Sequence, residues 1–442
     1  MSEKRPRFRV FVESFGCSSN LADGESIVGC LLKAGFEVVD ELQDADLLIC
    51  NTCAVKTPTE NRMIEILKRM AAAKNRRLIV TGCLPLINFE RLKAEVEFDA
   101  VLGPGHCADI VDAAHKVLNN ERVVWLDGNA ATKPCLDLPR SAVNPVVAII
   151  PVSYGCLGSC SYCCVVFARG HLRSCSADEV VRRVKRDLDS GAKEVWLTAQ
   201  DMACYGRDIG LDLVDLLREV CSVKGEFRVR VGMMTPSRVL KMLPDLVDAF
   251  QNQNVFKFIH LPVQSGDDEV LKSMNRSYSN KDFTRIVEAF REAIPSITLA
   301  TDVICGFPSE TQDAFEKTLR LIEKVKPDVV NVSRFFPRPK TSAEKMVPKV
   351  SQLDVKKRSQ KMSSLAKRIS TEKNSAWMHW KGRILVDECG KKPNSFIGRN
   401  FAYKPIVVKS RDQSLLGDFV DVHVIKTFRT YLEAEFVDSS DV

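Results

Sequence analysis

Short apolar segments alternate with longer amphipathic segments along the first third of the chain. The pattern predicts strands at Arg9–Ser14, Leu47–Asn51 and Leu78–Thr81, and helices at Leu21–Lys33 and Thr59–Ala72. Strands that alternate with helices at this spacing form a parallel sheet with helices on its faces. The first third therefore predicts an α/β domain, which we place at residues 7–125.

A second series of strands follows a proline-containing stretch, Asp127–Pro145, which we interpret as a boundary. The series begins with the apolar segment Val146–Val152, and Ser176-Ala-Asp-Glu179 matches a capping box that opens a helix. Further strands, with helical segments between them, are expected at Glu194–Thr198, Phe227–Gly232, Val255–Leu261, Ile297–Ile304 and Val329–Ser333. Six such units with right-handed crossovers curl into an open barrel, whereas a closed one needs eight. This barrel, with a basic helical extension, is expected at residues 142–373.

The last part of the chain returns to short strands rich in β-branched residues. They are expected at Arg383–Val386, Pro405–Val408, Phe419–Ile425 and Tyr431–Phe436. Short antiparallel strands over about 65 residues indicate a small barrel of the oligonucleotide-binding kind. We place it at residues 376–438, so the fold class is α/β with a terminal β-barrel.

The segment Arg334–Lys373 joins the two barrels, and we expect it to be helical. It holds 12 Lys and Arg against 3 Asp and Glu, a net of +9, whereas the whole chain has 64 against 57, a net of +7. Cations at this density favour contacts with phosphates, which position a nucleic acid without reading its sequence. A solvated helix face is the alternative interpretation.

Composition excludes several classes of protein. Hydrophobic residues make up 45% and charged residues 27% of the chain, as in ordinary globular proteins. No apolar run is long enough to span a membrane, and the N-terminus lacks the apolar stretch of a secretory signal, so we expect a cytoplasmic protein. Sixteen cysteines in such a protein indicate metal binding, because cytosolic thiols are kept reduced.

Three cysteines lie on one loop directly after the first barrel strand, in Tyr154-Gly-Cys156-Leu-Gly-Ser-Cys160-Ser-Tyr-Cys163. Three thiolates can hold three corners of a [4Fe-4S] cluster and leave one iron open to a cofactor or substrate. A zinc site is the alternative, but structural zinc takes four ligands. Cys164 is a poor fourth ligand, because adjacent side chains of an extended loop point to opposite sides. We therefore favour the cluster.

This CxxxCxxC loop, with an aromatic residue before its third cysteine, resembles the radical S-adenosylmethionine superfamily. The resemblance implies that the open iron chelates the methionine moiety of the cofactor, and that an electron from the cluster then yields a 5′-deoxyadenosyl radical. It also makes Tyr162 a candidate contact of the adenine.

Four other polar residues are candidate contacts of S-adenosylmethionine. Gln200 ends the second barrel strand, and Gln264 and Ser265 end the fourth, at the end of the barrel where active sites lie. Turn formation is the alternative role for these three. Arg276 suits the cofactor carboxylate, because a guanidinium binds a carboxylate with two hydrogen bonds; a surface arginine is the alternative.

Three further cysteines each follow a strand of the first domain. They are Cys17 in Ser14-Phe-Gly-Cys17, Cys53 in Asn51-Thr-Cys53 and Cys83 in Thr81-Gly-Cys83. The carboxyl ends of neighbouring parallel strands form one crevice, so we expect the three thiols to converge. Gly16 and Gly82 allow the backbone to approach whatever group they hold. Three unrelated buried thiols are the alternative, which leaves the repetition unexplained.

Together these features resemble the methylthiotransferases over essentially the whole chain. The resemblance implies that Cys17, Cys53 and Cys83 ligate an auxiliary [4Fe-4S] cluster with one open iron, and that the terminal barrel is an RNA-binding TRAM domain. The blocks most similar to the archaeal and eukaryotic branch, which acts on threonylcarbamoyladenosine in tRNA, are Phe167-Ala-Arg-Gly-His171, Tyr205-Gly-Arg-Asp-Ile-Gly210, His260-Leu-Pro-Val-Gln-Ser-Gly266, Thr301-Asp-Val-Ile-Cys-Gly-Phe-Pro308 and Phe336-Pro-Arg-Pro339. Thr198-Ala-Gln-Asp-Met202 departs from the acidic-rich version expected of the family, which weakens any transfer of roles to Gln200 and Asp201.

The resemblance implies that a methylthio group replaces the C2 hydrogen of threonylcarbamoyladenosine beside the anticodon. One S-adenosylmethionine would methylate a sulfur on the auxiliary cluster and a second would supply the radical, with no catalytic side chain beyond the cluster ligands. Expected partners are tRNA and an electron donor of the ferredoxin or flavodoxin type; the sulfur donor stays open, and we expect a monomer. The alternatives are isopentenyladenosine in tRNA or a ribosomal-protein aspartate as substrate, or a non-catalytic, metal-containing RNA-binding protein.

Overall fold

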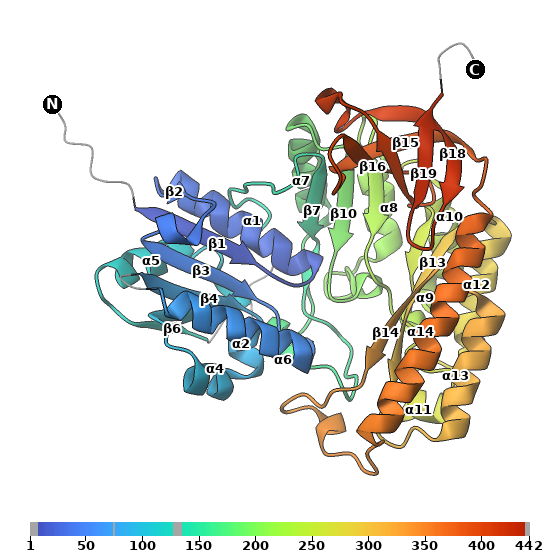
Figure 1. Cartoon of the computed structure of the whole chain (residues 1–442), viewed down its shortest axis with the longest axis horizontal. Coiled ribbons are helices and arrows are strands. Elements are labelled where there is room, and N and C mark those ends of the chain that lie inside the picture. Colours follow the sequence, from blue (N-terminus) through green and yellow to red (C-terminus); the bar gives the residue numbers. More distant parts are fainter. Residues whose placement is uncertain (1–7, 74–75, 127–134, 438–442) are drawn as a thin grey trace.

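The computed structural model describes residues 8–73, 76–126 and 135–437, which form an N-terminal lobe and a larger second lobe (Figure 1). Residues 127–134 of the predicted boundary stretch lie outside the described residues, as do residues 7 and 438 at the outer ends of the predicted first and last domains. No helix of the described part is long and apolar enough to cross a membrane.

The N-terminal lobe is a parallel sheet in the order β2-β1-β3-β4-β5-β6, counted within the described residues up to 126. Its strands are β1 (Arg9–Ser14), β2 (Glu37–Val38), β3 (Leu47–Thr52), β4 (Arg77–Gly82), β5 (Ala100–Leu102) and β6 (Val123–Trp125), and its helices are α1 (Ser18–Lys33), α2 (Thr57–Ala71), α3 (Leu84–Ile87), α4 (Phe89–Glu95) and α5 (Ile110–Leu118). Side chains of β3 alternate between two cores: Leu47 and Ile49 pack with α1 and α5, whereas Leu48 and Cys50 pack with α2. The predicted parallel sheet is confirmed; β2, β5 and β6 are additional.

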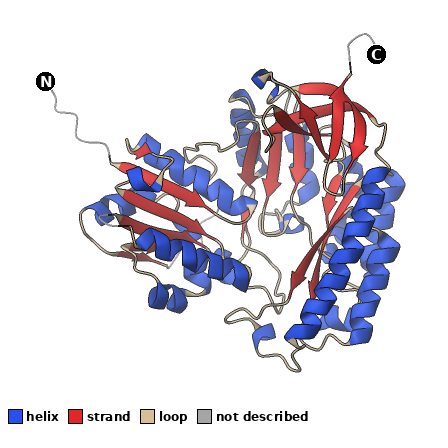
Figure 2. Ribbon diagram, viewed as in Figure 1, coloured by secondary structure: helices blue, strands red, loops and turns tan. Residues whose placement is uncertain are grey.

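The central part is the predicted open barrel of six parallel strands, in the described residues from 135 onward (Figure 2). The strands are β7 (Val147–Pro151), β10 (Glu194–Thr198), β11 (Arg228–Val231), β12 (Phe258–His260), β13 (Thr298–Cys305) and β14 (Val329–Arg334). They form two sheets, β11-β10-β7 and β12-β13-β14, which a single bridge between Val229 and Val255 connects. The fold class inferred from the sequence is thereby confirmed.

Helices cover the outside of the barrel (Figure 2). They are α7 (Ala177–Asp189), α8 (Leu213–Cys221), α9 (Pro236–Val239), α10 (Leu243–Gln251), α11 (Asp268–Ser273), α12 (Asn280–Ala293) and α13 (Gln312–Val325). A short hairpin, β8 (Ser153–Tyr154) with β9 (Arg173–Ser174), flanks the cysteine loop, and α6 (Val165–Arg169) packs against α3 of the N-terminal lobe. α7 begins at Ser176, whose Oγ accepts a hydrogen bond from the backbone N of Glu179 at 3.3 Å. The predicted capping box is therefore present.

The barrel is not closed between its first and last strands. On one side of the opening, α1 of the N-terminal lobe packs against β7, where Ala22 contacts Val147 and Ile149. On the other side, α14 (Gln352–Ser375) runs along β14. The N-terminal lobe thus borders the opening at β7, and α14 borders it at β14 (Figure 1).

The C-terminal part is a closed five-stranded barrel in the order β15-β16-β17-β19-β18. Its strands are β15 (Lys381–Cys389), β16 (Ser395–Arg399), β17 (Pro405–Lys409), β18 (Phe419–Thr427) and β19 (Leu432–Phe436). β17 and β19 pair in parallel, and β16 is a strand that the sequence pattern did not indicate. This barrel lies against the amino ends of the central strands: the backbone N of Lys257 donates to Phe401 O at 2.7 Å, and Lys404 pairs with Asp328 at 2.7 Å.

The prediction of a helix throughout Arg334–Lys373 is wrong in its first half. Arg334 ends β14, and helix α14 begins only at Gln352, because the intervening segment contains three prolines. Two arginines of the segment are also buried in ion pairs, Arg338 with Glu60 and Arg358 with Glu310. These two side chains are structural and cannot bind phosphates.

Candidate active site

Cys17, Cys53 and Cys83 lie at the carboxyl ends of β1, β3 and β4, three neighbouring strands. Gly16 has a φ of +119°, and a Cβ on it would lie 3.1 Å from the Cys53 Sγ. Burial, to which the nearby Cys17 and Cys53 thiols add, raises the pKa of Cys83 to about 12. The structure therefore brings the three thiols together. The backbone at Gly16 passes so close to Cys53 that a side chain on Gly16 would not fit.

A buried arginine of the second lobe lies beside these thiols. Arg169, at the end of α6, pairs with Asp23 of α1 at 2.6 Å, and both side chains are at most 3% exposed. It also donates to Asn20 Oδ1, the oxygen that accepts a hydrogen bond from the Cys83 Sγ at 3.6 Å. Its Nη1 has no hydrogen-bond partner among the described residues. A sulfur-rich anionic group held by the three cysteines fits this donor.

Cys156, Cys160 and Cys163 occupy the loop between β8 and α6. The backbone N of Gly158 donates to the Cys156 Sγ at 3.1 Å, and a Cβ on Gly158 would lie 3.7 Å from the Cys160 Sγ. Burial, with a smaller effect of the neighbouring Cys160 thiol, raises the pKa of Cys163 to about 12. Three converging thiols are one fewer than four irons require, which fits a [4Fe-4S] cluster with an open iron.

Cys164 is held apart from this set. It is buried in the core of the N-terminal lobe, and its Sγ donates to Ala54 O at 3.9 Å. The side chain of Cys164 thus serves packing between the lobes.

Sequence reasoning assigned no role to Cys204, which lies beside Cys156. The sulfur atoms of Cys156 and Cys204 and a carboxylate oxygen of Asp201 lie within 4.8 Å of one another. The Cys204 Sγ donates a hydrogen bond to Asp201 Oδ2 at 3.0 Å. Asp201 also accepts hydrogen bonds from the backbone of Ala203 and Thr235, so its carboxylate holds the loop after β10 in place. The sequence could have indicated Cys204 as a site residue, because its loop follows the carboxyl end of β10.

Three of the candidate cofactor contacts face the same region. Arg276 Nη2 donates to the Tyr162 hydroxyl at 2.6 Å, which ties the loop after α11 to the cysteine loop. Gln264 has a φ of +65° and lines a cavity between the lobes, and its Oε1 is buried without a hydrogen-bond partner among the described residues. An unpaired buried oxygen is costly, so a ligand that donates to it would be favoured.

The other two candidates are engaged within the protein. Gln200 accepts a hydrogen bond from Gly155 N at 2.6 Å and donates to Ser19 Oγ at 3.3 Å, so it connects the cysteine loop to α1. Ser265 is fully buried, and its hydroxyl lies 3.4 Å from that of Thr318 on α13. Ser265 therefore faces away from the barrel interior.

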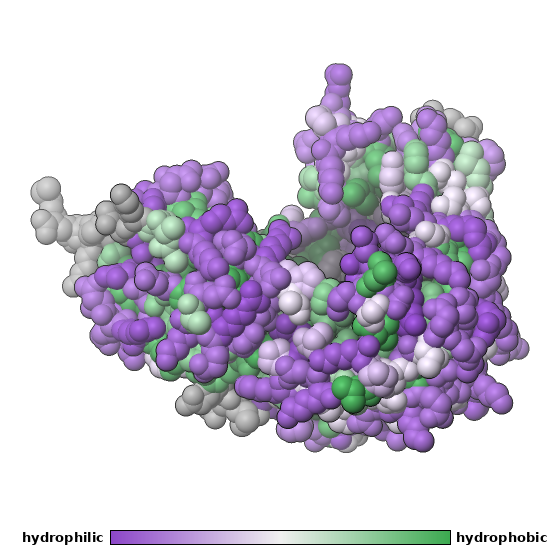
Figure 3. Space-filling view, turned by 60° about the horizontal axis from the view of Figure 1, so that its bottom comes forward, coloured by the Kyte–Doolittle hydropathy of each residue, from purple (hydrophilic) through white to green (hydrophobic). Residues whose placement is uncertain are grey.

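The cavity has a volume of about 1090 Å³ and opens between the lobes, where the surface is hollowed in Figure 3. Its wall includes Val55 and Lys56, just after Cys53, and Tyr162 of the other cysteine loop. It continues along β12, β13 and β14 to Arg399 and Tyr403 of the C-terminal barrel. The volume is at the upper end for small-molecule sites, which leaves room for a nucleotide.

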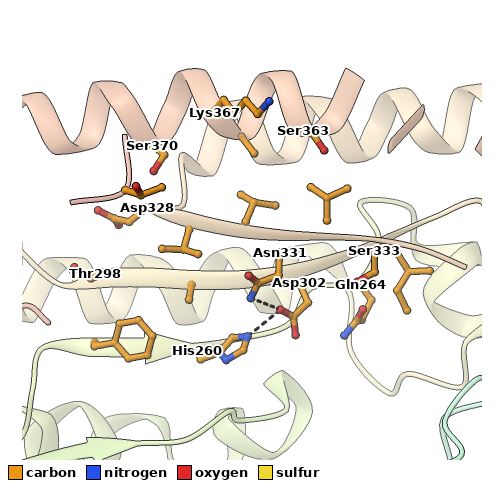
Figure 4. A pocket seen from close by; sticks show the side chains of 18 of the residues that line it. His260, Gln264, Thr298, Asp302, Asp328, Asn331, Ser333, Ser363, Lys367 and Ser370 are labelled. Atoms are coloured by element: carbon orange, nitrogen blue, oxygen red, sulfur yellow. Dashed lines mark hydrogen bonds and ion pairs between the residues drawn. The ribbon is translucent and has the colours of Figure 1, made fainter. Parts of the chain in front are cut away.

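Three polar side chains from successive strands meet inside this cavity (Figure 4). Asp302 Oδ1 accepts a hydrogen bond from Asn331 Nδ2 at 2.8 Å and lies 3.0 Å from His260 Nε2. Burial raises the pKa of Asp302, but the contacts with His260 and Asn331 and the charge of Lys56 outweigh it and lower the pKa. Sequence reasoning missed this group, although all three residues belong to strands that it predicted.

The chain matches the Radical SAM superfamily over residues 150–322, the Uncharacterized protein family UPF0004 over residues 9–103 and the TRAM domain over residues 382–437. These matches coincide with the open barrel, the N-terminal sheet and the terminal barrel, and they define a radical S-adenosylmethionine protein with an additional cysteine-bearing domain.

Relatives over the full length narrow the class. A "Probable threonylcarbamoyladenosine tRNA methylthiotransferase" of Pyrococcus horikoshii is 38% identical over 97% of this chain and 99% of its own. The "Threonylcarbamoyladenosine tRNA methylthiotransferase" of Homo sapiens is 31% identical over 98% of this chain and 75% of its own. The chain belongs to the threonylcarbamoyladenosine tRNA methylthiotransferase family, which implies [4Fe-4S] clusters and S-adenosylmethionine.

Solved structures agree on the fold. The radical S-adenosylmethionine methyltransferase TsrM from Kitasatospora setae, with tryptophan and a cofactor analogue bound, aligns with a TM-score of 0.55 at 15% identity. The alignment covers 77% of this chain and 75% of TsrM. At this identity the likeness concerns the fold alone.

Proposed function

We propose that this chain replaces the C2 hydrogen of threonylcarbamoyladenosine, next to the anticodon of tRNA, with a methylthio group. The observation that carries the proposal is the single cavity whose wall includes residues next to both cysteine sets, Val55 and Lys56 after Cys53 and Tyr162 in the other loop. A reaction that combines a radical from one centre with sulfur from the other requires one substrate position accessible to both.

The two sets of three cysteines have different roles in this proposal. Cys156, Cys160 and Cys163 would hold one [4Fe-4S] cluster, and Cys17, Cys53 and Cys83 would hold the auxiliary one, each with an open iron. When bound, the clusters and S-adenosylmethionine supply the radical and the methylated sulfur. A radical route suits the substrate, because an aromatic C–H is not acidic enough for a side-chain base at neutral pH.

The protein's own side chains position the reactants. Arg276, which Tyr162 orients, is placed to bind the cofactor carboxylate, and Gln264 presents its unpaired oxygen to a donor of the cofactor. Ser265 is not part of this set, and Gln200 acts by fixing the cysteine loop against the N-terminal lobe.

The RNA would be held by the TRAM barrel and by α14. Lys356, Lys357 and Lys361 are exposed on α14 and supply cations for phosphates, and Lys361 also pairs with Glu316 of α13 at 2.8 Å. We assign the three domains to residues 7–125, 142–373 and 376–438, and we expect a cytoplasmic monomer that receives electrons from a ferredoxin or flavodoxin.

The test is anaerobic reconstitution followed by mass spectrometry of tRNA nucleosides. Wild-type protein should bind eight irons, cleave S-adenosylmethionine reductively and convert threonylcarbamoyladenosine to its 2-methylthio form, while Cys156→Ala should bind four irons and cleave no cofactor. Cys164→Ala is the matched control and should retain both clusters. Conversion of isopentenyladenosine or of a ribosomal-protein aspartate instead would reassign the substrate, and bound zinc without cofactor cleavage would overturn the proposal.

A further inference from the structure

Three of the cations that line the cavity are neutralised by ion pairs within the protein. Arg338 pairs with Glu60, Arg399 with Asp387 and Lys404 with Asp328. Arg230 lies over the rings of Trp196, Phe258 and Tyr403. Four other cations of the wall make no ion pair within 4.0 Å in the part of the chain that the structure describes: Arg334, Lys367, Arg429 and Lys56. Of these four, Lys56 is the one that closely follows a cysteine of the N-terminal set in the sequence. Its charge is therefore available to a ligand.

Lys56 stands at the junction of the two lobes. It precedes the first residue of α2 and follows Cys53 by three residues. Its Nζ donates to the Ser333 hydroxyl on β14 at 2.7 Å, which fixes the ammonium at the cavity wall. An ammonium has three donors, so two stay free for an acceptor inside the cavity.

The other polar groups near Lys56 already contact side chains of the protein, and Arg334 donates to Ser359 Oγ at 2.9 Å. His260 and Asn331 both contact Asp302 Oδ1, and their side chains are committed to that carboxylate. Lys367 lines the cavity from α14 (Figure 4), and it is distant in the sequence from both cysteine sets. An anionic group close to Cys53 would therefore meet Lys56.

The chemistry of the substrate places an anion there. In adenine, C2, N1 and the N6 amino group lie along one edge of the ring, so a substituent on N6 that points toward N1 lies on the same edge as C2. Sulfur must reach C2 from the set that contains Cys53. The threonylcarbamoyl group ends in a carboxylate, whereas an isopentenyl group is apolar and would leave the ammonium without a partner.

We infer that Lys56 binds the carboxylate of the N6-threonylcarbamoyl group and thereby selects this nucleoside. The inference rests on the proposed function and adds the specificity-determining side chain. Ser333 positions the ammonium of Lys56. Because Lys56 follows Cys53 by only three residues, the group that recognises the N6 substituent lies next to the group that delivers sulfur to C2.

The test compares the binding of two anticodon stem-loops to the reconstituted holoenzyme with S-adenosylmethionine, under anaerobic conditions. One loop carries threonylcarbamoyladenosine, and the other carries its methyl ester, which lacks the negative charge. Wild-type protein should prefer the free acid by about tenfold, the contribution of one charge-assisted hydrogen bond. Lys56→Met should bind both loops equally, and Lys56→Arg should restore a preference.

Lys68→Met is the matched control. Lys68 lies on α2, the helix that follows Lys56, and pairs with Glu95 at 2.8 Å on the outer surface, so its loss should leave the preference at the wild-type value. A preference that persists in Lys56→Met, with iron content equal to wild type, would overturn the inference while the proposed function stands. A wild-type enzyme that forms no methylthio product on threonylcarbamoyladenosine would instead refute the proposed function itself.

Discussion

The buried ion pair between Arg169 and Asp23 joins the two lobes, and its removal should loosen them. In Arg169→Met, Asp23 keeps only the hydrogen bond from the Tyr154 hydroxyl and stays buried at 3% exposure. Leaving one partner of a buried pair uncompensated costs about 3–5 kcal/mol. Because the tyrosine still donates to Asp23, we expect a loss near the lower end, about 3 kcal/mol.

The pairing itself is tested by a double-mutant cycle. Asp23→Asn alone should cost a similar amount, since it leaves a buried guanidinium, but the combined variant should lose less than the sum of the two by about 2 kcal/mol or more. Hydrogen exchange of α1 and α6 in the apoprotein measures the free energy of local opening. Arg186→Met is the control, because Arg186 pairs with Asp137 on the surface at 2.7 Å, where such a pair contributes about 0–1 kcal/mol. Additive losses, or an effect of Arg169→Met as small as that of the control, would refute the coupling.

Three further changes probe the sulfur centre, the RNA-binding helix and the interface of the two barrels. Cys53→Ala should retain the radical cluster and still release 5′-deoxyadenosine, yet yield no methylthio nucleoside by mass spectrometry; near-normal product would contradict the role of the N-terminal cysteines. Replacing the exposed lysines of α14, Lys356, Lys357 and Lys361, by Gln should lower the slope of log affinity for tRNA against log salt by roughly 0.7 to 0.9 for each phosphate that the protein no longer neutralises, whereas an unchanged slope would leave this helix face solvated. Burial and the adjoining carboxylate of Asp387 raise the pKa of Glu194 from its ordinary 4.5 to about 8, so the folded state holds a proton that the unfolded chain releases. Stability should therefore fall as the pH rises between these values, and melting temperatures of Glu194→Gln should lack that dependence.

The hydrophobic pattern of the sequence predicted the longer strands of the sheets but not the shortest ones. Strands buried on both faces, such as β3, begin with a run of apolar residues, which can be recognised without knowledge of the neighbouring strands. β2, β5 and β6 have two or three residues, too few to show a period, and their positions depend on pairing with neighbours. The convergence of Cys17, Cys53 and Cys83 was predictable because strand ends of a parallel sheet meet at one edge.

The sequence predicted residues of the candidate site only where the position of a residue in a strand or loop determines which way its side chain points. Gln264 and Ser265 lie beyond β12, which ends at His260, so strand alternation does not tell which of them lines the cavity. Gln264 does so, and its φ of +65° is a backbone conformation that the sequence pattern does not indicate. The contacts of Asp302 with His260 and Asn331 join residues 42 and 29 positions apart, and the Arg169–Asp23 pair joins two domains. Such pairs depend on tertiary packing, which periodicity does not encode.

The missing two units of the barrel have a consequence for the kind of molecule that can react. A closed barrel admits only what enters at its top, so a reacting group must be small or stand at the end of a chain. Here β14 borders a lateral opening, and the cavity extends along it from the cysteine sets to the C-terminal barrel. One residue in the middle of a long polymer can enter sideways while the strand continues uncut on both sides, so no threading through the protein is required.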